Sequence, residues 1–278
     1  MNFIKTAFIL LSSAAFISAC NEANKDKKDE MITEKQVSIK EEPVSYSADS
    51  VNMNGYVTYN EADTAKRPVI LIVPEWWGLT DYPRSRAKQL AELGYLAMAV
   101  DMYGDGKTAE NPLLAGELSG PFYKDFAMAK SRFDAAVAKI KTYPQADTTR
   151  IAAIGYCFGG AQVLNMARLG ENLKGVVSFH GNLIGVAPDK ETLKADVLIC
   201  HGEEDKFVPA TEVTAFKKQM DSIGASYTFK SYPGSTHAFT NPAATEKGKQ
   251  YNIPIAYNAA ADSASWNDMK VFFNKIFK

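Results

Sequence analysis

A cysteine between glycines is the first feature of this chain that could do chemistry. The segment Gly155-Tyr156-Cys157-Phe158-Gly159-Gly160 has the form G-x-C-x-G, which is the nucleophile elbow with cysteine in place of serine. The nucleophile of such an elbow occupies a strained turn between a strand and a helix, so the residues two positions away must be small. The N–H groups that begin the helix would favour a thiolate and an oxyanion. The alternative is a glycine-rich turn that simply buries a cysteine.

A thiol nucleophile needs a base, and the base needs a group that orients it. The chain offers three histidines. His180 follows the apolar run 176–179 and would border the site, whereas His201 ends a predicted strand, where a structural role is more usual. His237 lies in a turn-rich loop after the last predicted strand and has no obvious packing role. We therefore favour His237 as the base.

The order of residues along the chain points to Asp205 as the orienting acid. Cys157, Asp205 and His237 follow the nucleophile–acid–histidine order of α/β-hydrolases. Asp205 directly precedes the segment that leads into the next predicted helix, while Glu203 and Glu204 are typical of solvated loop carboxylates. We expect Asp205 to hold the tautomer of the imidazole.

A fourth candidate, Glu75, follows a buried strand and precedes Trp76-Trp77-Gly78. A carboxylate between an apolar strand and two tryptophans is poorly solvated unless it has a partner. This position makes Glu75 a candidate site residue. The alternatives are a helix N-cap or a salt bridge to Arg84 or Arg86.

The elements that must position these residues alternate between strands and helices. Antiparallel strands are expected within 46–59, around turns at 49–50 and 54–55, and loops over the site at 109–121 and 241–254. This alternation predicts the α/β class, with a mainly parallel central sheet, helices on both faces and active groups beyond the carboxyl ends of strands. Further strands are expected at 68–73, 96–100, 151–154, 176–179, 197–200 and 227–232, and helices at 82–93, 122–142, 158–168, 210–223 and 263–277.

The first residues predict export and a lipid anchor. One charge at Lys5 precedes an apolar run over 7–17 that is too short to span a bilayer, and Ile17-Ser18-Ala19-Cys20 resembles the bacterial lipobox. We expect a lipoprotein signal peptide over 1–19, a lipidated Cys20 with a disordered charged tether over 20–45, and the folded domain over 46–278. The alternatives are a cleaved signal peptide with an incidental cysteine, or a signal anchor.

Composition limits the remaining choices. The 278 residues are 46% hydrophobic, enough for a sizeable core, and their net charge of −1 gives no reason to expect a nucleic-acid partner. Cys200 ends an apolar run and is typical of a buried structural cysteine. A Cys157–Cys200 disulfide is the less favoured alternative, because the two residues fall on different predicted elements.

Together, Glu75-Trp76-Trp77-Gly78, the cysteine turn, His201-Gly202-x-x-Asp205 and His237-Ala238-Phe239 resemble the dienelactone hydrolase family. The resemblance implies the α/β-hydrolase fold and a Cys157–His237–Asp205 triad that hydrolyses small esters or lactones through an acyl-thiol intermediate. It also implies that Glu75 helps to form the thiolate, that the N–H groups of Phe158 and Trp76 make the oxyanion hole, and that no metal or cofactor takes part.

The resemblance ends at the substrate. Asn241 stands where characterised dienelactone hydrolases have an arginine that holds the substrate carboxylate. The resemblance therefore does not extend to the family's namesake substrate. We expect a pocket that is more apolar or that stacks on sugars. The alternative is that its aromatic residues belong to the hydrophobic core. Besides Trp76 and Phe158, the candidate lining residues are Trp77, Tyr82, Phe207 and Phe239.

Two other functions compete with hydrolysis. One is a non-catalytic ligand-binding lipoprotein that retains the hydrolase scaffold, since a fold does not guarantee an activity. The other is redox work by an exposed thiol, which is disfavoured because the chain has no C-x-x-C pair. The preferred prediction is an ester or lactone hydrolase anchored by lipid in the bacterial cell envelope. The sequence gives no indication of its oligomeric state.

Overall fold

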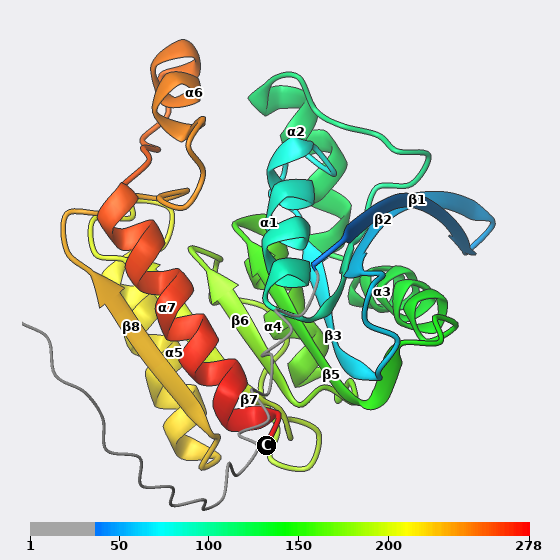
Figure 1. The fold of residues 1–278 in the computed structure, drawn as a ribbon. Helices are drawn as coiled ribbons and strands as arrows, with labels where there is room; N and C mark the ends of the chain where they lie inside the picture. The colour runs from blue at the N-terminus through cyan, green and yellow to red at the C-terminus, as the bar shows by residue number, and fades with distance from the viewer. Residues whose placement is uncertain (1–36) are drawn as a thin grey trace, which may run out of the picture. The chain divides into compact units, whose positions relative to one another are not determined.

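Eight strands form one sheet in the order β1-β2-β4-β3-β5-β6-β7-β8 (Figure 1). The fold was obtained as a computed structural model that describes residues 37–278. The expected signal peptide over 1–19 and the lipidated Cys20 lie outside the described residues. The strands are β1 (Ile39–Ala48), β2 (Val51–Asn60), β3 (Arg67–Val73), β4 (Leu96–Ala99), β5 (Ala146–Tyr156), β6 (Gly175–Phe179), β7 (Asp196–Gly202) and β8 (Tyr227–Tyr232).

The predicted mainly parallel sheet is confirmed. From β4 through β3, β5, β6 and β7 to β8 every neighbouring pair is parallel, and only β1 and β2 run antiparallel to their neighbours. The helices are α1 (Asp81–Glu92), α2 (Pro112–Ser119), α3 (Phe126–Ile140), α4 (Phe158–Arg168), α5 (Ala210–Ser222), α6 (Ala244–Tyr251) and α7 (Ala259–Ile276), with a 3-10 turn η1 at Gly120–Tyr123.

Helices cover both faces of the sheet because the central strands are apolar on both sides. In β3, Val69 and Leu71 belong to a buried cluster that takes in side chains of α3, α4 and α5. Ile70 and Ile72 alternate with them and belong to a second cluster, with side chains of α1 and α7. The continuous apolar run of β3 is thus explained by a two-sided core.

Two sequence expectations about the first strands need correction. Residues 39–45, assigned to the tether, lie in β1, which pairs with β2 along its whole length. Their polar composition gave no hint of this, because an edge strand is held by its backbone and needs few buried side chains. The pair Asn54-Gly55 is not a turn: β2 runs through it, and the only turn of that hairpin is at Asp49-Ser50.

The segments expected as loops over the site contain helices. Helix α2 lies within 109–121 and α6 within 241–254, while the long helix expected from Phe122 begins only at Phe126, after η1. Asn111 caps α2 by accepting the N–H of Leu114. Short helices of this kind lack the length for a clear apolar period, so the sequence pattern did not reveal them.

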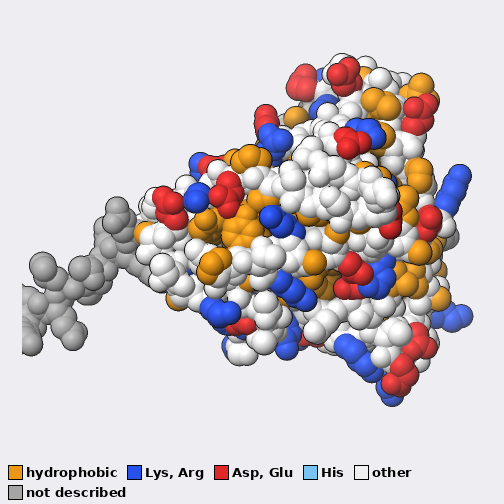
Figure 2. All heavy atoms as spheres, turned by 90° about the vertical axis from the view of Figure 1, so that its right-hand side faces the viewer, with side chains coloured by type: hydrophobic (Ala, Val, Ile, Leu, Met, Phe, Trp, Pro, Cys, Tyr) orange, Lys and Arg blue, Asp and Glu red, His pale blue; other side chains and the backbone are white. Residues whose placement is uncertain are grey.

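On the face drawn in Figure 2, acidic and basic side chains are interspersed, and neither sign gathers into a continuous stripe. Within residues 37–278, no helix combines the length and the apolar character needed to cross a membrane.

Candidate active site

The predicted site residues gather at the carboxyl ends of neighbouring strands. Glu75 follows β3, Cys157 follows β5, Asp205 follows β7 and His237 follows β8, and these strands lie side by side with β6. Four side chains that are distant in sequence are thereby brought to one edge of the sheet. Three of them, Glu75, Cys157 and His237, line a cavity of about 330 Å³, whose other lining residues are Trp76, Trp77, Gly116, Ser119, Gly120, Tyr123, Phe158, Asn182, Phe207, Ala238 and Ile255.

Cys157 occupies the strained turn that its sequence context predicts. Its φ is 53° and its ψ is −116°, a backbone conformation that residues other than glycine rarely adopt. A Cβ at Gly155 would lie 2.0 Å from the carbonyl oxygen of Gly159, and a Cβ at Gly159 would lie 2.1 Å from that of Val73. Both glycines are therefore required by the close approach of α4 to β5 and β3.

His237 is joined to Asp205 by a hydrogen bond of 2.8 Å between Nδ1 and Oδ2. The other oxygen of Asp205 accepts the backbone N–H of Phe207 at 2.8 Å, so this buried carboxylate is held on both sides. Burial by itself would lower the pKa of His237, but Cys157 and Asp205 outweigh it and raise the pKa to about 10. The structure thus joins His237 to Asp205 and places Cys157 and His237 on the lining of the same cavity.

Glu75 has a partner that the sequence did not suggest. Its Oε2 accepts the side-chain amide of Asn241 at 2.6 Å. Burial raises the pKa of the Glu75 carboxyl, and Asn241 and Lys247 oppose the shift only in part. The alternative of a salt bridge to Arg84 or Arg86 is not realised among the described residues, where no hydrogen bond joins Glu75 to Cys157 either.

Two residues of the cavity lining carry the backbone N–H groups expected in an oxyanion hole. Phe158 is the first residue of α4, so its N–H has no acceptor within the helix. Trp76 directly follows Glu75, and Trp76 and Phe158 both line the cavity. The helix start pointed to Phe158, whereas Trp76 was implied only by the family resemblance.

The aromatic residues expected in the pocket divide into two groups. Trp77 and Phe207 line the cavity with Trp76 and Phe158, as expected. Tyr82 and Phe239 do not: Tyr82 packs edge to face on Tyr156 and hydrogen-bonds Thr240, while Phe239 is fully buried against Tyr232. Their place in the sequence could not show which way they face, because that depends on how α1 and the His237 loop pack.

The remaining cysteine and histidines have distinct surroundings. Cys200 is buried and Cys157 is partly exposed, and both are free cysteines, so the alternative of a disulfide between them is wrong. Burial raises the pKa of the Cys200 thiol to about 12. His201 packs on Phe229 within the sheet, whereas His180 contacts the nucleophile turn.

Sequence reasoning missed one wall of the cavity. It is built by α2 and η1 with Gly116, Ser119, Gly120 and Tyr123, and Tyr123 packs edge to face on Phe158. Asn182 and Ile255 complete the lining from two other loops. The only available signal was that 109–121 and 241–254 would lie over the site.

Comparison with known proteins agrees with this architecture. The profile of the dienelactone hydrolase family matches residues 53–277. A relative from Aquifex aeolicus with the provisional name carboxymethylenebutenolidase is 30% identical over 210 residues, which is 71% of this chain and 86% of that protein. Another with the same provisional name, from Methylorubrum extorquens, is 32% identical over 62% of this chain, and the match spans 63% of that protein.

Solved structures show the same likeness. A dienelactone hydrolase-like promiscuous phosphotriesterase from metagenomic libraries superposes with a TM-score of 0.81 at 31% identity, over 86% of this chain and 98% of its own. A dienelactone hydrolase structure from Klebsiella pneumoniae, also provisionally named, has a TM-score of 0.73 at 23% identity, over 85% of this chain and 99% of its own. The second likeness shows the fold alone.

The pairing of His237 predicts its titration. The folded pKa of about 10 lies above the unfolded value of about 6.5, so the pairing stabilises the protein fully below about pH 6.5 and is lost as pH rises through about 10. NMR of the ring signals, assigned by single substitutions of the three histidines, should give this midpoint. Cys157→Ala should lower it, and a midpoint near 6.5 in the wild-type chain would contradict the pairing.

Proposed function

The chain belongs to the dienelactone hydrolase family and is a carboxylic ester or lactone hydrolase; from that premise we propose that its reaction runs through a covalent acyl-thiol intermediate on Cys157. The observation that carries the proposal is the His237–Asp205 hydrogen bond, which leaves the other ring nitrogen of His237 free to serve Cys157. A non-catalytic binding role is not favoured, because such a role needs no buried acid behind the histidine.

The reaction proceeds in two displacements. The thiolate sulfur of Cys157 attacks the carbonyl carbon, the bond from that carbon to the leaving oxygen breaks, and the imidazolium of His237 gives its proton to the departing alkoxide. A lactone opens in this step and its alcohol stays attached. Neutral His237 then takes a proton from water, whose oxygen attacks the thioester and releases the carboxylic acid and Cys157.

The surrounding groups support these steps. In this mechanism the N–H groups of Phe158 and Trp76 bind the oxyanion of each tetrahedral intermediate. Glu75 takes the thiol proton when the thiolate forms, since a buried carboxylate with a raised pKa accepts a proton readily. The proton that His237 gives to the leaving group is a separate one, which His237 already carries at neutral pH because its pKa is raised to about 10. Asp205 holds the tautomer of His237 and stabilises the imidazolium.

Removing the nucleophile tests the mechanism. Cys157→Ala should reduce hydrolysis of p-nitrophenyl acetate by at least about a hundredfold, since an activated nucleophile is lost. Intact-mass measurement of a His237→Asn enzyme mixed with this ester should show an acetyl group on Cys157, because deacylation then lacks its base. An unchanged rate in Cys157→Ala would reject the assignment, and Cys200→Ala serves as the matched control at the buried thiol.

The cavity favours uncharged substrates. Its lining contains no Lys or Arg, and Glu75 is a buried acid whose partner is the neutral amide of Asn241. Lys247 lies outside the lining, 4.0 Å from the centre of the Trp77 ring. A substrate carboxylate would enter this apolar space without a cation to pair with, which is unfavourable. Neutral alkyl or aryl esters, lactones and neutral phosphotriesters suit it better.

A pair of matched esters tests this preference. p-Nitrophenyl butyrate and mono-p-nitrophenyl succinate have acyl chains of equal length, and kcat/KM should favour the neutral butyrate by about tenfold or more. Asn241→Arg should narrow the difference by supplying a cation. Paraoxon, a neutral phosphotriester, should also release p-nitrophenol in a Cys157-dependent manner. Equal rates on the two esters would refute the preference for neutral substrates.

We also propose that the enzyme is held in the bacterial cell envelope by lipid on Cys20, on the strength of the lipobox-like segment Ile17-Ser18-Ala19-Cys20. Expressed in a bacterium that processes lipoproteins, the wild-type chain should incorporate labelled palmitate and fractionate with membranes. Cys20→Ala should lose both properties, because the acylated thiol is gone. Palmitate on the Cys20→Ala chain would refute the assignment.

A further inference from the structure

His180 forms a hydrogen bond with the backbone of the nucleophile turn. Its Nδ1 accepts the backbone N–H of Cys157 at 3.1 Å, and the carbonyl oxygen of Phe179 accepts the same N–H at 3.0 Å. An imidazole that accepts at Nδ1 is neutral and carries its proton on Nε2. That nitrogen lies 2.7 Å from Oγ1 of Thr240, so His180 links the backbone of the nucleophile to Thr240.

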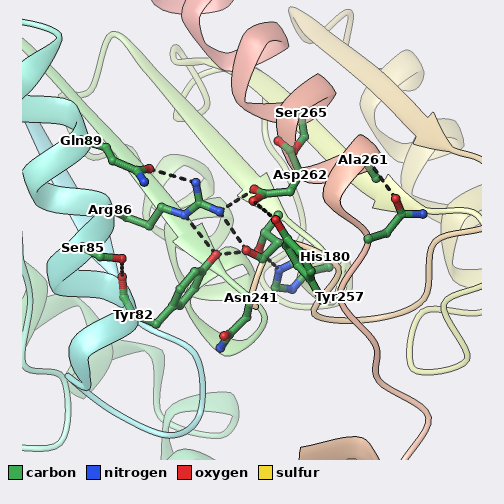
Figure 3. Close-up of polar contacts among 12 residues, drawn as sticks. Tyr82, Ser85, Arg86, Gln89, His180, Asn241, Tyr257, Ala261, Asp262 and Ser265 are labelled. Atoms are coloured by element: carbon green, nitrogen blue, oxygen red, sulfur yellow. Dashed lines mark hydrogen bonds and ion pairs between the residues drawn. The ribbon is translucent and has the colours of Figure 1, made fainter. Parts of the chain in front are cut away.

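Thr240 belongs to a network of polar contacts whose other members, His180, Tyr82, Arg86 and Asp262, are labelled in Figure 3. Its hydroxyl accepts the O–H of Tyr82 at 2.7 Å, and its carbonyl oxygen accepts Nη2 of Arg86 at 2.8 Å. Arg86 is also paired with Asp262, and its Nε donates to the Tyr82 oxygen at 3.4 Å. The network therefore ties α1, which carries Tyr82 and Arg86, to α7, which carries Asp262.

The network is connected to two parts of the proposed triad. Thr240 is three residues beyond His237 in the same loop, and His180 contacts the turn that carries Cys157. His180 lies with its ring 5.2 Å from that of His237 and 5.3 Å from that of Phe239. Cys157 and His180 both have positive φ, at 53° and 42°. Strained residues of this kind persist only where their surroundings fix them firmly.

We propose that His180 is a positioning residue, which through Thr240 and Arg86 sets the separation between the sulfur of Cys157 and the imidazole of His237. The proposal rests on the Cys157–His237–Asp205 mechanism above. His180 touches no substrate in this role, because it does not line the cavity. Burial and the nearby charge of His237 lower the pKa of His180 well below its usual range, which keeps Nδ1 available as an acceptor.

Thr240 offers the cleanest test, because its hydroxyl can be removed at almost constant volume. In the full-length chain, Thr240→Val should lower kcat for p-nitrophenyl acetate and the rate of alkylation of Cys157 by iodoacetamide by about tenfold, with KM little changed. The NMR titration midpoint of His237 should fall as well, since its separation from Cys157 grows. Thr240→Ser, which keeps the hydroxyl, should restore all three values.

Thr58→Val is the matched control. Thr58 is fully buried in β2, and its hydroxyl has no hydrogen-bond partner within residues 37–278. This variant should leave alkylation and kcat unchanged. A melting temperature within about 3 °C of wild type establishes that a variant is folded.

His180 itself provides a second pair of variants. His180→Asn keeps an oxygen near the position of Nδ1, and asparagine tolerates the positive φ, so it should retain most of the alkylation rate. His180→Phe keeps a ring but no acceptor and should lose as much as Thr240→Val. Folded Thr240→Val and His180→Phe enzymes with kcat and alkylation within twofold of wild type would overturn the positioning role.

Alkylation needs no ester, so the two proposals can fail separately. Hydrolysis that requires Cys157 but ignores Thr240 and His180 would support the mechanism and overturn the positioning role. Alkylation that depends on the Thr240 hydroxyl in a chain that hydrolyses no ester would support the positioning role and reject the mechanism.

Discussion

The conformation of Cys157 is the constraint on which the rest of the site depends. A residue other than glycine at φ 53° is strained, and it persists here because β5 ends and α4 begins on either side of it. The strain requires that α4 approach β3 and β5 closely, and this approach leaves no room for a Cβ at Gly155 or Gly159. Because Cys157 immediately precedes α4, it lies at the N-terminus of this helix, where an anion is stabilised.

The second constraint is the burial of charge around this turn. Burying an ion is unfavourable unless it is paired and hydrogen-bonded, and Arg86 with Asp262 and His237 with Asp205 satisfy that condition. Glu75 does so only through the neutral Asn241, and its pKa is raised accordingly. Glu75 also lines the cavity, where a group that exchanges a proton is useful.

Segments outside the sheet, α2, η1 and α6, contribute to the cavity wall or pack against Trp77. Helix α2 and η1 bring two glycines, Gly116 and Gly120, to the cavity wall, where neither would clash if it carried a Cβ. Helix α6 presents Tyr251 and Lys247 to the Trp77 ring from the other side. The apolar walls are thus assembled from segments that play no part in the sheet. Substrate selection can therefore change without disturbing the strands that hold Cys157, His237 and Asp205.

The sequence by itself determined the strands β3 to β8, the elbow glycines, the order of Cys157, Asp205 and His237, and the gathering of these residues at one edge of the sheet. Each of these follows from a local pattern: continuous apolar runs, required small residues, or the position of a residue after a strand. Such patterns also predicted Trp77 and Phe207 in the pocket but could not exclude Tyr82 and Phe239.

Only the tertiary structure decided the partners of Glu75 and of the nucleophile turn. Asn241 and Glu75 are 166 positions apart, and His180 and Thr240 are 60 apart. The sequence contains no periodicity that links such residues, and the partners weighed as an alternative for Glu75 were arginines near it along the chain. The contacts exist because parallel strands return repeatedly to one edge of the sheet, where α1, α7 and the loop after β8 close over the same turn.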